Sequence, residues 1–372
     1  MTPAYADITV PTWTAAGGHA TVEVTSFCDL RCLYCYQSDP NFVRRKADQA
    51  VLENIISQFC KLGVPEVTLT GAGEITTHKG WEKLVAMLRS AGISYTLTTN
   101  FSRRYSVSEI DALAAASQLT ISFDTHDPEL HAKIRRRSDL SVIFENLLRV
   151  VSRSKETGHK PYINNNVVVS YETVTGLPAM AEKAKGLGID RVALLYMLDG
   201  QKLEGSFRVT ELMTPSGEIK NGVLESLSAF RAAAEANDLD IFVSQIIADM
   251  ENVPTMPLVE TIPRDVTSPT MCEAAPATTR LCVAPWRTVY VTTQGKVGPC
   301  CLLSDYLGTL ENQTVSEAVR SDRMVALQQA LWRGRLETSS LPAANDVCAK
   351  CCIYPRGSVE TLAAMVMGPP SG

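Results

Sequence analysis

Three cysteines near the start of the chain have the type and spacing to bind metal. Cys28, Cys32 and Cys35 form a C-x3-C-x2-C pattern directly after a strand-like run at residues 20–25. Thiolates are soft ligands that suit zinc, copper or iron–sulfur clusters. The first residues lack the charged-then-apolar pattern of an export signal, so we expect these cysteines to bind metal rather than to form disulfides.

The spacing favours an iron–sulfur cluster over zinc. Structural zinc is usually bound by one close cysteine pair that a distant second pair completes, whereas here three cysteines share one loop and no fourth lies nearby. A cubane held by three thiolates has one iron without a protein ligand. Because that iron can bind and reduce a small molecule, the pattern indicates catalysis, with a structural zinc loop as the alternative.

A second cysteine group lies near the end of the chain. Cys282 and Cys300 are separated by 17 residues, and a C-x2-C pair, Cys348 and Cys351, follows after a further 47 residues. A Gln294-Gly295 turn is expected to bring Cys300 back towards Cys282. Four thiolates would complete a tetrahedral site for either zinc or a cubane.

The elements that must position the first cysteine group alternate between strands and helices. The expected strands are Thr21–Thr25, Glu66–Thr70, Ser94–Thr99, Gln118–Phe123, Tyr162–Ser170 and Arg191–Met197, and the expected helices are Ala47–Leu62, Gly80–Ala91, Ser106–Ala116, Leu140–Ser154 and Val174–Leu187. This alternation predicts an α/β fold with a parallel sheet. It leaves a doubly wound sheet and a barrel as alternatives, and both bind ligands at the carboxyl ends of their strands.

The cysteine loop resembles the signature loop of the radical S-adenosylmethionine (SAM) superfamily, in which an aromatic residue, here Tyr34, precedes the last cysteine. The resemblance implies a partial (β/α)6 TIM-type barrel over residues 20–210. It also implies a 4Fe–4S cluster that binds SAM, cleaves it to a 5′-deoxyadenosyl radical and so removes a hydrogen atom from a substrate. Flavodoxin or ferredoxin is the external electron donor that such an enzyme needs.

The same resemblance implies which residues contact SAM. The glycine-rich loop after the second strand, which in this superfamily holds the methionine amino group, corresponds to Gly71, Ala72, Gly73 and Glu74. The other implied SAM-binding residues are Tyr34, Thr99, Asn100, Ser122, Asp124, Arg135, Asn166 and Leu195. The alternatives are an ordinary turn for the glycines, helix capping for the polar strand ends, and a solvated position for Arg135.

The C-terminal cysteine order resembles the shortened SPASM module, also called a twitch domain, which carries one auxiliary 4Fe–4S cluster. This implies a small α+β iron–sulfur domain at residues 271–360, with Cys282, Cys300, Cys348 and Cys351 as ligands, and two 4Fe–4S clusters in the protein. A full SPASM module would require further cysteines after Cys348 and Cys351, but no cysteine follows Cys352. Zinc is the alternative at this site.

The rest of the chain divides into an N-terminal extension (1–19), a linker (211–270) and a tail (361–372). The linker contains a helical pattern, a short strand-like run and a proline-rich segment. The C-terminal part is expected to contain a hairpin and one amphipathic helix. Apart from the proline-rich segment, these elements are expected at Gly217–Asn237, Asp240–Val243, Thr288–Cys300 and Val315–Trp332.

Composition and charge exclude several classes of function. The chain of 372 residues is 45% hydrophobic and 20% charged, as in a globular enzyme. A net charge of −5, with no basic block longer than Arg135-Arg136-Arg137, argues against nucleic-acid binding. No apolar run reaches the ~18 residues that a membrane span needs. Eleven cysteines without an export signal predict a cytoplasmic location.

The predicted activity is oxidation or epimerisation of a small polar substrate in natural-product biosynthesis, such as a sugar, aminocyclitol or nucleoside intermediate. An electron-accepting auxiliary cluster would give dehydrogenation, whereas a cysteine that donates a hydrogen atom would give epimerisation. Cys272, Cys301 and Cys352 adjoin the second group and are the candidate donors. Inert buried thiols are the alternative for them.

A peptide-modifying enzyme of natural-product biosynthesis is the competing prediction. It is disfavoured because only residues 1–19 precede the expected barrel, which leaves no room there for a peptide-binding domain. The single-cluster arrangement instead resembles that of radical SAM alcohol dehydrogenases of aminoglycoside biosynthesis. A non-catalytic electron carrier or zinc protein is the third alternative.

Overall fold

A curved, mostly parallel sheet forms the centre of the protein. The computed structural model describes residues 13, 18–196, 209–214, 219–244, 247–248, 279–332, 348, 356–357, 361–362 and 365–366. Within them the sheet has the strand order β13-β12-β11-β1-β3-β4-β5-β7-β8-β9. Its strands are β1 (His19–Glu23), β3 (Glu66–Thr70), β4 (Ser94–Thr98), β5 (Gln118–Ser122), β7 (Tyr162–Val168), β8 (Arg191–Leu195), β9 (Asp240–Val243), β11 (Thr288–Val291), β12 (Lys296–Gly298) and β13 (Gly308–Thr309).

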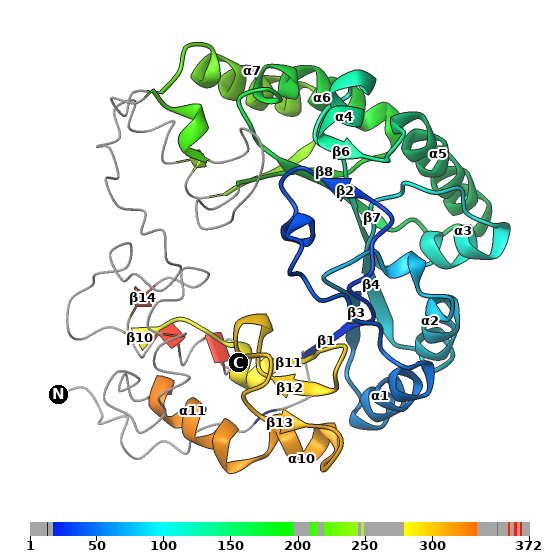
Figure 1. The fold of residues 1–372 in the computed structure, drawn as a ribbon, viewed down its shortest axis with the longest axis vertical. Coiled ribbons are helices and arrows are strands. Elements are labelled where there is room, and N and C mark those ends of the chain that lie inside the picture. The colour runs from blue at the N-terminus through cyan, green and yellow to red at the C-terminus, as the bar shows by residue number, and fades with distance from the viewer. Residues whose placement is uncertain are drawn as a thin grey trace, which may run out of the picture.

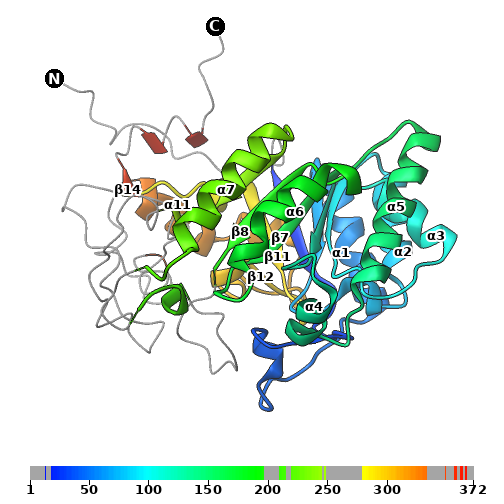
Figure 2. The same ribbon diagram turned by 90° about the horizontal axis from the view of Figure 1, so that it is seen from above.

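Helices cover the outer side of this sheet, as Figures 1 and 2 show. They are α1 (Gln49–Leu62), α2 (Trp81–Ser90), α3 (Val107–Ala114), α4 (Pro128–Ile134), α5 (Leu140–Thr157), α6 (Leu177–Ala184) and α7 (Val223–Ala236). Each of the six strands β1, β3, β4, β5, β7 and β8 is followed by at least one of them. The described sheet is open, with β9 and β13 at its edges, so the predicted partial (β/α)6 barrel is confirmed.

Strict alternation of side chains explains how the sheet forms two different faces. In β1, Ala20 and Val22 are fully buried under the helices, whereas Thr21 and Glu23 point to the opposite, helix-free face. The neighbouring strands repeat this pattern in register, since Thr21 pairs with Thr68 and Thr68 with Thr96. The helix-free face is therefore polar, and the helix-covered face holds the main hydrophobic core.

The helix boundaries follow from local capping. Asp48, Asp127 and Asp139 accept hydrogen bonds from the first backbone N–H groups of α1, α4 and α5, and Ser106 forms a capping box with Glu109 at the start of α3. The short helix α4 was not expected from the sequence. None of the helices in the described ranges has both the length and the apolar character that crossing a bilayer requires.

The C-terminal hairpin joins the main sheet. The expected hairpin forms as β11 and β12, but β11 also pairs in parallel with β1, in the register Ala20 to Val289. Likewise β9, expected as a short strand in the linker, pairs with β8. The single helix expected at Val315–Trp332 is wrong, because the structure has α10 (Val315–Val319) and α11 (Asp322–Trp332) with a break between them.

Candidate functional site

The cysteine loop follows β1 and lies on the inner side of the curved sheet, where Figure 1 labels its short strand β2 (Arg31–Cys32). This strand pairs with β6 (Arg135–Arg136), which directly follows α4. Cys28, Cys32 and Cys35 contribute to one small apolar cluster with Leu30, Tyr34 and Ile134. The fold thus brings the three predicted ligands together at the carboxyl ends of the parallel strands.

The three thiols form a donor set that fits a cubane. Burial raises the pKa of Cys28 to about 12 and that of Cys32 to about 11, and it also raises the pKa of Cys35. Metal binding must therefore displace protons from these thiols. Among the described residues no three His, Cys, Asp or Glu side chains converge on a single metal ion. A cubane still fits this loop, because each thiolate binds a different iron.

The glycine-rich loop after β3 is fastened to the backbone of the cysteine loop. The N–H of Gly73 donates to the carbonyl of Thr25 at 3.2 Å, and the N–H of Glu74 donates to the carbonyl of Phe27 at 2.7 Å. A Cβ on Gly71 would lie 2.1 Å from the Thr25 oxygen, and one on Gly73 would lie 2.1 Å from the Phe27 oxygen. These glycines are therefore required for close approach between two protein segments.

Gly73→Ala is expected to destabilise the fold by about 1–3 kcal/mol, because the new methyl group must displace rigid backbone. The matched control is Gly186→Ala, where a Cβ would have no neighbour within 4 Å. Urea unfolding of both variants measures the difference. Equal unfolding midpoints for the two variants would contradict the assigned packing role.

Glu74 connects the ends of β3 and β4. Its buried carboxylate accepts hydrogen bonds from the Thr99 hydroxyl at 2.7 Å, the Asn100 N–H at 2.7 Å and the Thr76 hydroxyl at 2.8 Å. Burial raises the pKa of Glu74, although these three bonds favour the charged form. Three of the SAM-binding residues implied by the sequence, Glu74, Thr99 and Asn100, thus lie in direct contact.

Asp29 is a site residue that sequence reasoning missed. Its carboxylate accepts hydrogen bonds from the Asn100 side chain at 2.9 Å and from the Ser102 hydroxyl. The same Asn100 nitrogen lies 3.8 Å from the Cys28 sulfur. Asp29 therefore fixes the position of Cys28 relative to the end of β4. Only its place beside the first cysteine marks it in the sequence.

A buried ion pair fixes the other side of the cysteine loop. Arg135 donates to both carboxylate oxygens of Asp124, with Nε to Oδ2 at 2.7 Å and the second bond at 3.1 Å. Asp124 also accepts from the Tyr34 hydroxyl at 2.9 Å and from the Val168 N–H at 2.9 Å. Burial lowers the pKa of Arg135, but Asp124, Tyr34 and Cys32 together raise it by more, so the pKa lies above its usual value. Tyr34, Asp124 and Arg135, which the resemblance implies as SAM contacts, are thus also linked to one another by hydrogen bonds to Asp124.

The remaining implied SAM-binding residues lie on the helix-free face. Ser122 pairs in register with Asn166, and Leu195 pairs with Val168. The Asn166 side chain accepts a hydrogen bond from Asn164 at 2.7 Å. Ala72, in the glycine-rich loop, receives a hydrogen bond on its carbonyl from the side chain of Gln37, just after the third cysteine.

The described part of the C-terminal cysteine group surrounds a second small core. Cys300 and Cys348 pack against a cluster that includes Trp286, Leu303 and Trp332, and Leu281 and Val283, the neighbours of Cys282, pack there too. Two of the four predicted ligands, Cys300 and Cys348, thus pack against one core, and Cys282 lies between two residues that do. Cys301 is exposed. Cys351 and two candidate hydrogen-atom donors, Cys272 and Cys352, lie outside the described residues.

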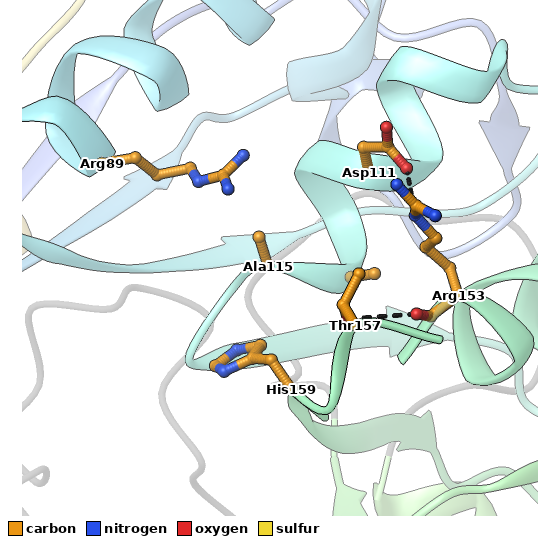
Figure 3. Close-up of a pocket in the computed structure, with 7 residues that line it drawn as sticks. Arg89, Asp111, Ala115, Arg153, Thr157 and His159 are labelled. Carbon is orange, nitrogen blue, oxygen red and sulfur yellow. Dashed lines mark hydrogen bonds and ion pairs between the residues drawn. The ribbon is translucent and has the colours of Figure 1, made fainter. Parts of the chain in front are cut away.

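A separate pocket of about 420 Å³ opens between the outer helices (Figure 3). Its charged walls include Arg89 of α2, Asp111 of α3 and Arg153 of α5, and the last two form an ion pair at 2.6 Å. None of the predicted site residues lines this pocket. It lies on the helix-covered side of the sheet, away from both cysteine groups.

Comparison with known families agrees with the two parts of the site. The model of the radical SAM superfamily matches residues 22–184, and that of an iron–sulfur cluster-binding domain, SPASM, matches residues 282–352.

The chain is 30% identical over 227 residues to a GTP 3′,8-cyclase of Rhodopseudomonas palustris, covering 58% of this chain and 59% of the relative. It is 32% identical over 177 residues to a GTP 3′,8-cyclase of Caulobacter vibrioides, covering 45% of this chain and 49% of that relative. The chain therefore spans less than two thirds of the length of these relatives.

Solved structures share the fold at low sequence identity. Streptococcus suis SuiB bound to the precursor peptide SuiA has a TM-score of 0.58 and 16% identity, covering 94% of this chain and 76% of that chain. The structure of anSMEcpe with bound AdoMet has a TM-score of 0.53 and 16% identity, covering 91% of this chain and 88% of that chain. At such identities the likeness shows the fold alone.

Proposed function

The chain carries a domain of the radical SAM superfamily followed by a SPASM iron–sulfur cluster-binding domain, and from this premise we propose that it is an enzyme that uses SAM to oxidise or epimerise a small polar substrate. One observation carries the proposal. The three cysteines of one loop are held at the carboxyl ends of the parallel strands by the Glu74 loop and by the Asp124–Arg135 pair.

Cys28, Cys32 and Cys35 would hold one 4Fe–4S cluster, and Cys282, Cys300, Cys348 and Cys351 would hold the second. When bound, the first cluster and SAM together supply a 5′-deoxyadenosyl radical that removes a hydrogen atom from the substrate. Tyr34, the loop from Gly71 to Glu74, Thr99 and Asn100 would position SAM. The further candidates are Ser122, Arg135, Asn166 and Leu195, on β5, β6, β7 and β8, and Asp124, which follows β5.

The helix-free face supports a polar substrate. At the carboxyl ends of the strands its described side chains include Thr70, Thr98, Ser122 and Asn166, and Ser122 pairs in register with Asn166. Hydroxyl and amide groups of this kind offer hydrogen bonds to a sugar, an aminocyclitol or a nucleoside intermediate. Flavodoxin or ferredoxin would supply the electron that SAM cleavage consumes.

Cyclisation of a purine nucleotide is the second candidate function. It is favoured by the relatives that are GTP 3′,8-cyclases, one of them 30% identical over 227 residues. A peptide substrate is the third candidate, because the fold is shared with SuiB. Incubation with GTP or with a peptide therefore belongs in the same assay as incubation with amino sugars and aminocyclitols.

With reductant and substrate, the anaerobically reconstituted enzyme is expected to release 5′-deoxyadenosine and methionine in step with product. Deuterium placed on the attacked carbon of the substrate should appear in 5′-deoxyadenosine, because the hydrogen atom is transferred directly. Mass spectrometry of the nucleoside measures this. Formation of S-adenosylhomocysteine with a methylated product would contradict the proposal.

The same incubation in D2O separates the two outcomes for the substrate. Dehydrogenation leaves a carbonyl and no solvent deuterium at the attacked carbon, and we propose this outcome. Epimerisation would place deuterium there, delivered by a thiol. Loss of that deuterium in Cys272→Ala, Cys301→Ala or Cys352→Ala would then identify the donor.

A further inference from the structure

Glu23 is a carboxylate at the carboxyl end of β1, on the helix-free face of the sheet. Two groups of the C-terminal hairpin donate hydrogen bonds to it. The Tyr290 hydroxyl donates to Oε1 at 2.6 Å, and the Thr293 N–H donates to Oε2 at 3.3 Å. A carboxylate can accept about four hydrogen bonds, so two acceptor positions remain for a ligand.

No cation compensates the charge of Glu23 among the described residues, since both of its partners are neutral donors. Glu66, at the opposite end of the same face, differs in having an ionisable partner, because its carboxylate lies 3.0 Å from Nδ1 of His19. Burial and the bond to Glu23 raise the pKa of Tyr290. The phenol therefore stays protonated and acts as the donor in this hydrogen bond.

This pair lies close to the first cysteine loop. β1 leads directly into that loop, and Tyr36, which follows Cys35, is close enough to Tyr290 to raise its pKa. β11 leads through its hairpin to β12, and Cys300 follows that strand. A ligand at Glu23 would therefore lie at the strand end from which the first candidate cluster loop leaves.

We propose that Glu23, oriented by Tyr290 and Thr293, binds an ammonium group of the substrate, and that the substrate is an amine-bearing polar metabolite. A half-buried carboxylate without a cation partner is stabilised by a ligand cation, because the two charges form hydrogen bonds in a medium of reduced dielectric. A phosphate group at the same position would instead be repelled. This inference rests on the proposed function, since it names the substrate class of that site.

The test is calorimetric binding to the anaerobic, SAM-loaded protein. The probes are a panel of aminocyclitols and amino sugars that includes 2-deoxystreptamine, their neutral counterparts such as myo-inositol, and GTP with Mg²⁺. At least one amine is expected to bind about tenfold or more tightly than its neutral counterpart. Glu23→Gln should weaken the binding of that amine by about ten- to a hundredfold, because the substitution removes a charged hydrogen bond.

Glu66→Gln is the matched control, because it removes a carboxylate from the same face at the other end of the strands. Amine binding should be unchanged in this variant. Glu23→Gln also keeps an oxygen that can accept from Tyr290, so its urea unfolding midpoint should match that of the wild type. A purely structural role for Glu23 would leave amine binding unchanged in Glu23→Gln.

Three results would overturn the inference: no amine of the panel outbinds its neutral counterpart, GTP binds most tightly, or Glu23→Gln binds the amine as the wild type does. Tightest binding of GTP would favour the second candidate function, whereas the other two results can be told apart from failure of the proposed function. That failure would appear as wild-type protein that holds no cluster or does not cleave SAM with reductant, an assay that needs no substrate.

Discussion

Simultaneous replacement of Cys28, Cys32 and Cys35 by alanine is expected to remove about half of the bound iron and to abolish SAM cleavage. Wild-type protein reconstituted anaerobically should contain about eight iron atoms in two 4Fe–4S clusters, and the triple variant about four. The reason is that Cys28, Cys32 and Cys35 belong to a core beside β2, whereas Cys300 and Cys348 pack against a separate core that includes Trp286. Loss of the first group therefore leaves the second intact.

Iron analysis and electron paramagnetic resonance of the reduced proteins measure this outcome. Cys60→Ala is the control, because Cys60 lies in α1 and belongs to neither group. This variant should keep the full iron content and cleave SAM at the wild-type rate. About twelve iron atoms in the wild type, or one zinc per chain, would refute the assignment of a single auxiliary cluster.

The sequence was sufficient to predict the main parallel strands that position the site, but not α4 or the pairing of β2 with β6. Strands such as Glu66–Thr70 alternate apolar and polar residues, and the helices between them carry their own caps, so both signals are local. The position of β11 was not predictable in this way. A hairpin has the same pattern whether it forms its own small sheet or extends a larger one, and only the structure shows its pairing with β1.

The candidate site shows the same division between local and long-range signals. The cysteines and the glycine-rich loop were found because their spacing is local. The partners of Gly71 and Gly73 could not be predicted, because the backbone that these glycines approach lies more than 40 residues away in sequence. Glu23 and Tyr290 are 267 residues apart. No pattern within either strand indicates that these two side chains meet.

Asp124→Asn is expected to destabilise the fold by about 3–5 kcal/mol and to lower the iron content of the first site. Arg135 and Asp124 are buried, with 7% and 1% of their side chains exposed, so the change leaves a buried guanidinium without its counter-charge. It also disturbs the bond from Tyr34, which lies between two predicted ligands. Urea unfolding and iron analysis measure the two effects.

The exposed pair of Lys133 and Glu172, at 2.7 Å, provides the control. Glu172→Gln should cost no more than about 1 kcal/mol, because water screens an exposed ion pair. Replacing both buried partners, as in Asp124→Leu with Arg135→Met, should recover much of the stability lost in Asp124→Asn, since no unpaired charge remains. The iron content of the first site should stay low in this double variant, because its apolar side chains cannot accept a hydrogen bond from the Tyr34 hydroxyl. If Asp124→Asn unfolds at the same urea concentration as Glu172→Gln, the buried pair does not fix the cysteine loop.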